Sequence, residues 1–404
     1  MTEAQRDDFS IAVTSFFMKV VGLWTSDNET EQRKRNITLC YTILQMMYGV
    51  YLQSTDFYHS KGDFSALLYT LVNILSVVIG LFKVIVLFVH KKDFFNLVMH
   101  LQQHFLNATY DNYEKTILNT CKNTCAIFIG LFTFFTHVTL ICYVTSPLIV
   151  NMGKNESDRM LPFKMYLDLP LSMSPYYEII FIIEALALYQ IGVCYFCFDN
   201  CLCLMNLHVA TQFRILQYRL ANMRNTNEKE TIQENSDAYR STEKSYAAFK
   251  SNVQQHQSLI AYCNKLEKVF NLFALGQMLV FSLIICFDGC QVIMVELYAG
   301  RRFIFLFHLI NCLAQLLMFT YSCDQLIHES VKIATAVYRA PWTCLPMTKY
   351  GRELRKDAVF VIMRSKIPCC LTAKGFFPVS LETYTKVWST AASYFTLLRQ
   401  AIEI

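Results

Sequence analysis

The sequence predicts an all-α, polytopic membrane protein with seven transmembrane helices, a cytosolic N-terminus, an extracellular C-terminus and a cytosolic helical anchor region. The 404 residues are 54% hydrophobic and only 17% charged, and their mean hydropathy is +0.30. A soluble protein of this length is far less apolar. Apolar segments long enough to cross a bilayer recur along the chain, and Lys and Arg gather in alternate connections between them.

The elements follow in order from this pattern. Residues 1–36 contain the basic cluster Arg33–Arg35 and lack a cleavable signal, so we expect a cytosolic N-terminal segment. Residues 37–321 should hold the first six transmembrane helices and the ligand pocket. The predicted spans are Ile37–Thr55, Phe64–Val89, Cys125–Val150, Ile179–Met205, Val269–Leu297 and Phe303–Tyr321. Residues 379–404 should form a seventh, less hydrophobic helix and an extracellular C-terminus.

Two long polar segments are expected on the cytosolic side. Residues 206–268 form a helical connection that runs without Pro or Gly into the fifth span, which should project beyond the bilayer. Residues 322–378 hold further anchor helices, the first of which ends before Pro341. These segments can form a helical bundle beneath the membrane, or amphipathic helices that lie on the inner leaflet.

The orientation follows from the distribution of cationic residues. The connections assigned to the cytosol carry 27 Lys and Arg residues, and those on the opposite side carry seven. Four glycosylation sequons are present, and only the one at Asn155 is extracellular in this topology.

No catalytic motif is apparent, so we expect neither an enzyme nor a cofactor. Four cysteines near the end of the fourth span, Cys194, Cys197, Cys201 and Cys203, have spacings that can suggest a metal site. They have no His within a helical turn, which favours apolar packing and no bound metal.

Ionisable residues inside the spans can instead face cavities, and a transporter could use them as a proton relay; they are Lys83, Glu184, Asp199, Asp288, Glu296, His137 and His308. We see no pair of Gly- or Pro-broken spans that would support a transporter.

Aromatic side chains concentrate in the outer halves of the second to sixth spans. A helix-lined cavity of this composition, with a few polar groups, suits a small apolar ligand. The candidate ligand-binding residues are Tyr69, Asn73, Phe134, His137, Ile141, Phe181, Ala185 and Tyr189. Lipid contact or core packing is the alternative for each of them. The loop after the third span contains Phe163 and four prolines, and it can form a lid or an ordinary loop.

The seventh span carries a regular polar stripe. Its members follow one another at steps of four, four, three and four and therefore share one helical face; they are Thr385, Ser389, Ser393, Thr396 and Gln400. Such a face can make a polar contact with another helix or line a water-filled lumen. One helix cannot enclose a pore, but several subunits around an axis can.

The C-terminal run "IPCCLTAKGFFPVSLETYTKVWSTAASYFTLLRQ" resembles the signature of the insect odorant receptors. The segments "CDQLIHESVKIATAVYRAPW" and "LPFKMYLDLPLSMSPYYEIIF" are similar to the family's region after the sixth helix and to its second outer loop. These motifs cover about a quarter of the chain.

A G-protein-coupled receptor is the seven-helix alternative. It would need an extracellular N-terminus, which the charge distribution does not support, and an Asp-Arg-Tyr motif and an Asn-Pro-x-x-Tyr motif, which we do not see at the expected places in the sequence.

The resemblance implies an odorant-gated, non-selective cation channel in the plasma membrane of the dendrite or cilium of an olfactory sensory neuron. A small volatile odorant would bind within each subunit, and the seventh helices would line a shared pore. By position, Leu397 resembles the hydrophobic gate residue, with Ser393 and Gln400 on the pore side and Ala401 where the co-receptor has a second large apolar residue. The 206–268 connection lacks the co-receptor's long insertion. The resemblance therefore implies a tuning subunit that joins co-receptor subunits in a heterotetramer, with no nucleic-acid partner.

Overall fold

The computed structural model confirms the all-α class. It describes residues 9–24, 28–156, 159–163, 172–223, 235–293, 299–340, 342 and 345–403, which contain helices, no named strand and one isolated bridge between Thr372 and Pro378. The elements are α2 (Phe9–Val21), α3 (Glu29–His59), α4 (Phe64–Val89), α5 (Lys91–His100), the π-helix η1 (Leu101–Leu106), α6 (Asn112–Val150), α7 (Tyr176–Ala221), α8 (Asn235–Ile293), α9 (Ala299–Arg339), α10 (Lys349–Ser365) and α11 (Leu381–Glu403).

Five of the described helices, α4, α6, α7, α8 and α9, are long and apolar enough to cross a membrane. Helix α4 has the same limits as the predicted second span, because Asp63 caps its N-terminus with hydrogen bonds from two backbone N–H groups. Helices α3 and α11, with 31 and 23 residues, have sufficient length but are more polar than these five. They correspond to the predicted first and seventh spans.

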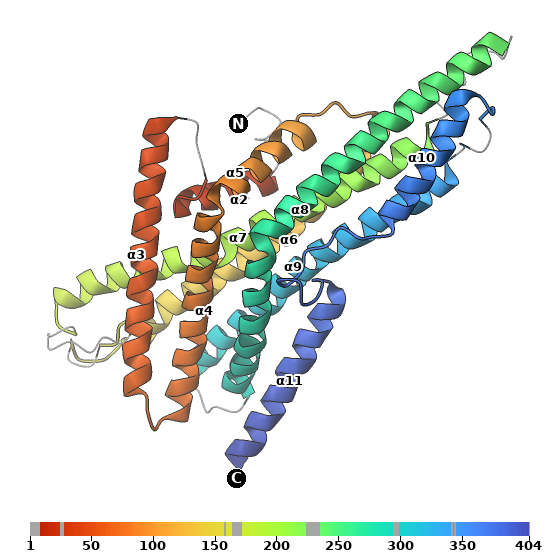
Figure 1. Cartoon of the computed structure of the whole chain (residues 1–404). Helices are drawn as coiled ribbons and strands as arrows, with labels where there is room; N and C mark the ends of the chain where they lie inside the picture. The colour runs from red at the N-terminus through yellow and green to blue at the C-terminus, as the bar shows by residue number, and fades with distance from the viewer. Residues whose placement is uncertain are drawn as a thin grey trace.

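Several helices are much longer than a bilayer requires. Helix α7 has 46 residues and is therefore about 69 Å long, roughly twice the thickness of a hydrocarbon core. The N-terminal part of α8, the ends of α7 and α9, and α10 continue together at the upper right of Figure 1. Phe249 and Leu266 of α8 are buried there, as the helical periodicity of the 206–268 connection predicts. From the sequence we expect the fifth span to project beyond the bilayer and residues 322–378 to form further anchor helices.

Helix α2 was not predicted, because 13 residues are too few to cross a membrane. It packs against α3, α6 and α7, and Phe17 lies edge-on to Phe196 of α7 with ring centroids 4.8 Å apart. Gly22 ends the helix at a φ of +85°, and a Cβ at this position would lie 2.5 Å from the Arg35 carbonyl oxygen of α3. The close approach of α2 to α3 therefore requires glycine here.

Polar contacts fix the projecting region. Glu114 of α6 accepts two hydrogen bonds from the guanidinium of Arg219 at the end of α7, at 2.6 and 3.1 Å. His256 of α8 is buried against Phe213, and this burial together with the nearby Arg364 lowers the pKa of His256 to about 4. His256 is therefore neutral in the folded protein at physiological pH.

Candidate ligand cavity and pore helix

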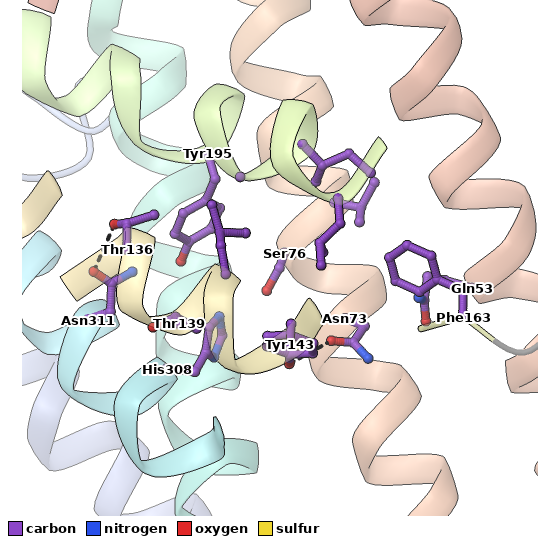
Figure 2. Close-up of a pocket in the computed structure, with 15 residues that line it drawn as sticks. Gln53, Asn73, Ser76, Thr136, Thr139, Tyr143, Phe163, Tyr195, His308 and Asn311 are labelled. Atoms are coloured by element: carbon purple, nitrogen blue, oxygen red, sulfur yellow. Dashed lines mark hydrogen bonds between the residues drawn. The ribbon is translucent and has the colours of Figure 1, made fainter. Parts of the chain in front are cut away.

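A cavity of about 80 Å³ lies among α3, α4, α6, α7 and α9. One water needs about 10–15 Å³, so the space suits a small molecule. Figure 2 shows side chains from all five helices converging on it. The polar and aromatic lining residues are Gln53, Asn73, Ser76, Thr136, Thr139, Tyr143, Phe163, Tyr195, His308 and Asn311, and the aliphatic ones are Val77, Leu140, Leu188 and Ile191, with Gly192 between α6 and α7.

Two features close the cavity. At Gly192 of α7, an added Cβ would lie 2.6 Å from Leu140 Cδ2, so glycine allows α6 and α7 to approach each other at the cavity wall. Phe163 comes from the loop after α6, and its backbone N–H donates a hydrogen bond to the buried Glu184 carboxylate at 3.0 Å. The loop residue Phe163 thus covers one side of the cavity, as Figure 2 shows.

Most polar groups of the cavity are already paired. The Tyr143 hydroxyl donates to Asn73 Oδ1, and the Thr136 hydroxyl donates to Asn311 Oδ1, both at 3.0 Å (Figure 2). Among the residues described, Asn73 Nδ2 and Gln53 Oε1 are buried without a hydrogen-bond partner. A ligand at this end of the cavity can therefore meet one donor and one acceptor after small side-chain rotations.

A second polar layer lies behind the cavity. His308 Nδ1 is 2.8 Å from Oδ2 of the buried Asp288 on α8. Beside Tyr195, Lys83 of α4 forms an ion pair with Asp199 of α7. Lys83 Nζ also donates a hydrogen bond to the Tyr195 carbonyl oxygen at 3.3 Å. Lys83 Nζ lies 2.6 Å from Asp199 Oδ2, and both side chains are 0% exposed. Of the ionisable residues predicted to face cavities, His308 lines this one, the other described ones do not, and Glu296 lies outside the described residues.

The predicted ligand residues occupy several environments. Asn73 lines the cavity, and the others do not. Tyr69 packs edge-on against Phe305, and Phe181 packs against Tyr177. Phe134 and His137 line a separate, open groove between α2 and α6, whereas Ile141 and Tyr189 are exposed on the bundle surface and Ala185 is half-buried. Contact of these residues with an odorant stays a prediction.

The predicted ligand residues of α6 and the α6 residues that line the cavity lie on different faces of the helix. On α6 the prediction selected positions 134, 137 and 141, whereas the cavity is lined by Thr136, Thr139 and Tyr143, which lie on a neighbouring face. A row of hydroxyl groups at helical spacing inside an apolar span was a signal for this face. The aromatic residues obscured it, because they also pack against lipid and against other helices.

Helix α11 lies at the edge of the bundle and packs along α8 (Figure 1). Ala391 is buried on the packed side, whereas all five residues of the polar stripe are exposed within this chain. Ser393 and Thr396 donate their hydroxyl protons to helix carbonyls one turn earlier, at 2.9 Å. Each hydroxyl oxygen still has acceptor capacity that faces away from the chain.

Leu397 and Gln400 of the predicted gate lie on the exposed side of α11. The Leu397 side chain is 61% exposed, and it follows Ser393 by one helical turn. Gln400 is also exposed, and Ala401 belongs to the helix, although its side chain lies outside those described. None of the helices described in a single chain therefore covers this face of α11.

A family model described as 7tm Odorant receptor matches residues 63–392. Odorant receptor 13a of Drosophila melanogaster is 25% identical over 324 residues, which cover 74% of this chain and 75% of that protein. Odorant receptor 10 of Aedes albopictus is 24% identical over 261 residues, which cover 64% of each protein. Similarity to these relatives extends over most of the helical bundle.

The fold is similar to that of a solved receptor at low sequence identity. The insect olfactory receptor OR5 from Machilis hrabei, solved in complex with eugenol, superposes with a TM-score of 0.78 at 13% identity, covering 96% of this chain and 97% of that one. The matched residues include the predicted second to sixth spans and most of the seventh, Val379–Leu398. Because the family model covers well over half of its length, the chain belongs to the odorant receptor family of helical membrane proteins.

Proposed function

We propose that this receptor is the odorant-binding tuning subunit of a heterotetrameric, ligand-gated, non-selective cation channel. It is a receptor and not an enzyme. The exposed polar stripe on α11 is the observation that carries the proposal. Hydroxyl and amide groups on a membrane-length helix are costly in lipid, and none of the described helices of the same chain covers them. A shared aqueous path between subunits would hydrate them.

The cavity among α3, α4, α6, α7 and α9 is the proposed odorant site. Its walls are mainly apolar, with a few polar groups at defined places, as small-molecule sites usually are. The structurally similar OR5 was solved with eugenol, a small organic compound, which supports a ligand of this class here. Asn73, Gln53 and Tyr143 offer hydrogen bonds at one end, and His308 lies at another (Figure 2).

The pore constriction is proposed at Leu397, with Ser393 and Gln400 as the polar residues beside it. Ala401 replaces the second large apolar gate residue that the resemblance to the co-receptor would imply. Coupling to the cavity can pass through His308 and Asp288, because the next residue, Gly289, faces α11: a Cβ at that position would lie 3.8 Å from Phe395 Cδ2. An odorant can open the pore only to the extent that it binds the open arrangement more tightly.

Co-receptor subunits are the proposed partners in the projecting region. Helix α10 buries Leu354 and Ala358 against its own chain but exposes large apolar side chains on the other side. Val359, Phe360 and Met363 form this exposed face, and Phe360 is 69% exposed. A contiguous apolar surface outside the bilayer is typical of a protein contact. Together with the missing insertion, this face supports assembly with co-receptor subunits.

The proposed orientation has the N-terminus in the cytosol and the C-terminus outside, in the plasma membrane of an olfactory sensory neuron's dendrite or cilium. Helix α2 lies toward the top of the bundle and the end of α11 at the bottom in Figure 1, and the ratio of 27 to seven cationic residues favours this orientation. Glycosylation of Asn155 alone among the four sequons would agree with it. Glycosylation at Asn36 or Asn107 would indicate the opposite orientation.

Recording membrane current with and without a co-receptor, over a panel of volatile compounds, tests the function. We expect odorant-evoked cation current only when the two subunits are expressed together. Replacing Leu397 by Ala should increase the current in the absence of odorant, because a smaller side chain widens the apolar ring. No current with any volatile compound, or transport of a substrate with fixed stoichiometry in place of a current, would contradict the proposal.

A further inference from the structure

Two cysteines of α6 and one histidine of α7 come together where these helices run toward the projecting region. Cys121 and Cys125 are one helical turn apart, and His208 faces them from α7. The Sγ atoms and an imidazole nitrogen lie within 4.8 Å of one another, and all three side chains are buried. Two thiols and an imidazole form a typical ligand set for a thiophilic metal ion.

The environment of His208 requires an explanation. The residue is 0% exposed, and among the residues described neither Nδ1 nor Nε2 has a hydrogen-bond partner. A neutral imidazole has one N–H donor and one acceptor nitrogen, and each unsatisfied buried group costs about 1–3 kcal/mol. A metal bond to the acceptor nitrogen removes one of these two costs.

The distance between the two sulfur atoms also fits an ion. Cys121 Sγ and Cys125 Sγ are 4.0 Å apart. Zinc–thiolate bonds of about 2.3 Å at a tetrahedral angle place two sulfur atoms about 3.8 Å apart. The ion therefore needs only a small rotation of either thiol. Three protein ligands leave a fourth position, as in zinc sites that keep a water.

Charge supports the same assignment. An isolated charge is costly in a buried, low-dielectric region, but two thiolates and one Zn²⁺ have a net charge of zero. The two thiol protons are released when the metal binds. We propose that Cys121, Cys125 and His208 form a binding site for a thiophilic metal ion, for which Zn²⁺ gives exact charge balance, and that this ion fixes α6 to α7.

Two other clusters in the described structure fit less well. Asp288, His308 and Cys312 also place their donor atoms within 4.8 Å of one another, but Asp288 Oδ2 and His308 Nδ1 are only 2.8 Å apart. Two ligands at about 2.0–2.1 Å from a tetrahedral ion are about 3.3 Å apart, so this pair is a hydrogen bond. Cys286 and Cys290 are buried and one turn apart on α8 without forming part of a metal-binding group in the described residues, so they provide a matched control.

The site lies on the same two helices as the Glu114–Arg219 ion pair. That ion pair joins the start of α6 to the end of α7. The metal would join the same two helices at buried positions nearer their middle. The metal and the ion pair together would prevent α6 and α7 from sliding past each other between the projecting region and the cavity. We therefore expect loss of the metal to lower the thermal stability of the receptor, although the residues that line the cavity are unchanged.

The experiment measures zinc and copper by mass spectrometry in the full-length receptor, purified in detergent without a polyhistidine tag. We expect about one ion per chain in the wild type. The content should fall to background in Cys121→Ser/Cys125→Ser and in His208→Leu. It should stay at the wild-type value in Cys286→Ser/Cys290→Ser.

X-ray absorption on the wild-type protein decides the case if the variants fail to fold. Two sulfur neighbours at about 2.3 Å and at least one nitrogen would support the site. A wild-type protein without stoichiometric zinc or copper, or a metal bound only through oxygen and nitrogen, would overturn it. Equal metal content in the Cys121/Cys125 and Cys286/Cys290 variants would also overturn it.

Discussion

Replacing Lys83 by Met removes one partner of the most buried ion pair described in the bundle. Lys83 Nζ lies 2.6 Å from Asp199 Oδ2, with both side chains 0% exposed, and Gln315 also donates a hydrogen bond to Asp199. Asp199 Oδ1 is buried without a partner among the described residues. After the substitution, the Asp199 carboxylate keeps the amide of Gln315 but loses its counter-charge.

The expected cost follows from this geometry. Attraction at 2.6 Å is worth about 6 kcal/mol at an effective dielectric constant of about 20, and it offsets a desolvation cost of several kcal/mol for each ion. Removing Lys83 alone leaves the cost of burying Asp199, about 3–5 kcal/mol. Removing both charges in Lys83→Met/Asp199→Asn should restore most of the lost stability, because neither charge is then buried.

Thermal unfolding in detergent, followed by the fraction of monodisperse receptor and compared at one heating rate, is the assay. We expect the single variant to unfold on the order of 5–10 °C below the wild type and the double variant close to the wild type. Lys268→Met is the control, because its pair with Asp93, at 2.8 Å, is largely exposed and should leave stability nearly unchanged. A Lys83→Met receptor as stable as the wild type, or a double variant less stable than the single one, would refute the reasoning.

Three further predictions concern the cavity, the projecting region and the subunit contact. Replacing Asn73 by Leu removes the acceptor of the Tyr143 hydroxyl and should raise the odorant concentration for half-maximal current about tenfold; an unchanged dose–response curve would exclude Asn73 from the site. Because the pKa of His256 is about 4 in the folded protein and about 6.5 when unfolded, the unfolded state binds more protons below pH 6.5, and stability should fall by up to about 3 kcal/mol as the pH drops from 6.5 to 4. His256→Gln should flatten this dependence in pH-resolved thermal unfolding, and an equal slope would contradict it. Replacing Phe360 by Glu should reduce co-purification with co-receptor subunits while leaving the chain folded, and undiminished co-purification would place the contact elsewhere.

The sequence predicted the helices well because apolar length and turn residues are local properties. The limits of the second span coincide with α4, where Asp63 caps the start and an apolar run ends at Val89. Helix α2 escaped prediction because it is stabilised by packing against α6 and α7, not by its own length. The extension of α6 before Cys125 escaped prediction for a similar reason, since its polar end is held by contacts such as Glu114 with Arg219.

The cavity was harder to predict than the polar stripe of α11. The stripe on α11 repeats along one helix, so the sequence alone places Ser393 and Gln400 on one face. The cavity depends on the rotation of five helices about their axes. A rotation of one or two residues separates Phe134 and His137, which line the groove beside α2, from Thr136 and Thr139, which line the cavity. Only the packed structure fixes this rotation.

The central claim is that the polar face of α11 borders water in a pore that odorant opens. Introducing Ser393→Cys, with Ala391→Cys as the control on the face packed against α8, and applying a cationic thiol-reactive reagent during odorant-evoked current tests it directly. We expect a progressive and irreversible change of the current for Ser393→Cys, faster with odorant than without, and no change for Ala391→Cys or the wild type. An unreactive Ser393→Cys receptor that still conducts, or equal effects at both positions, would contradict it.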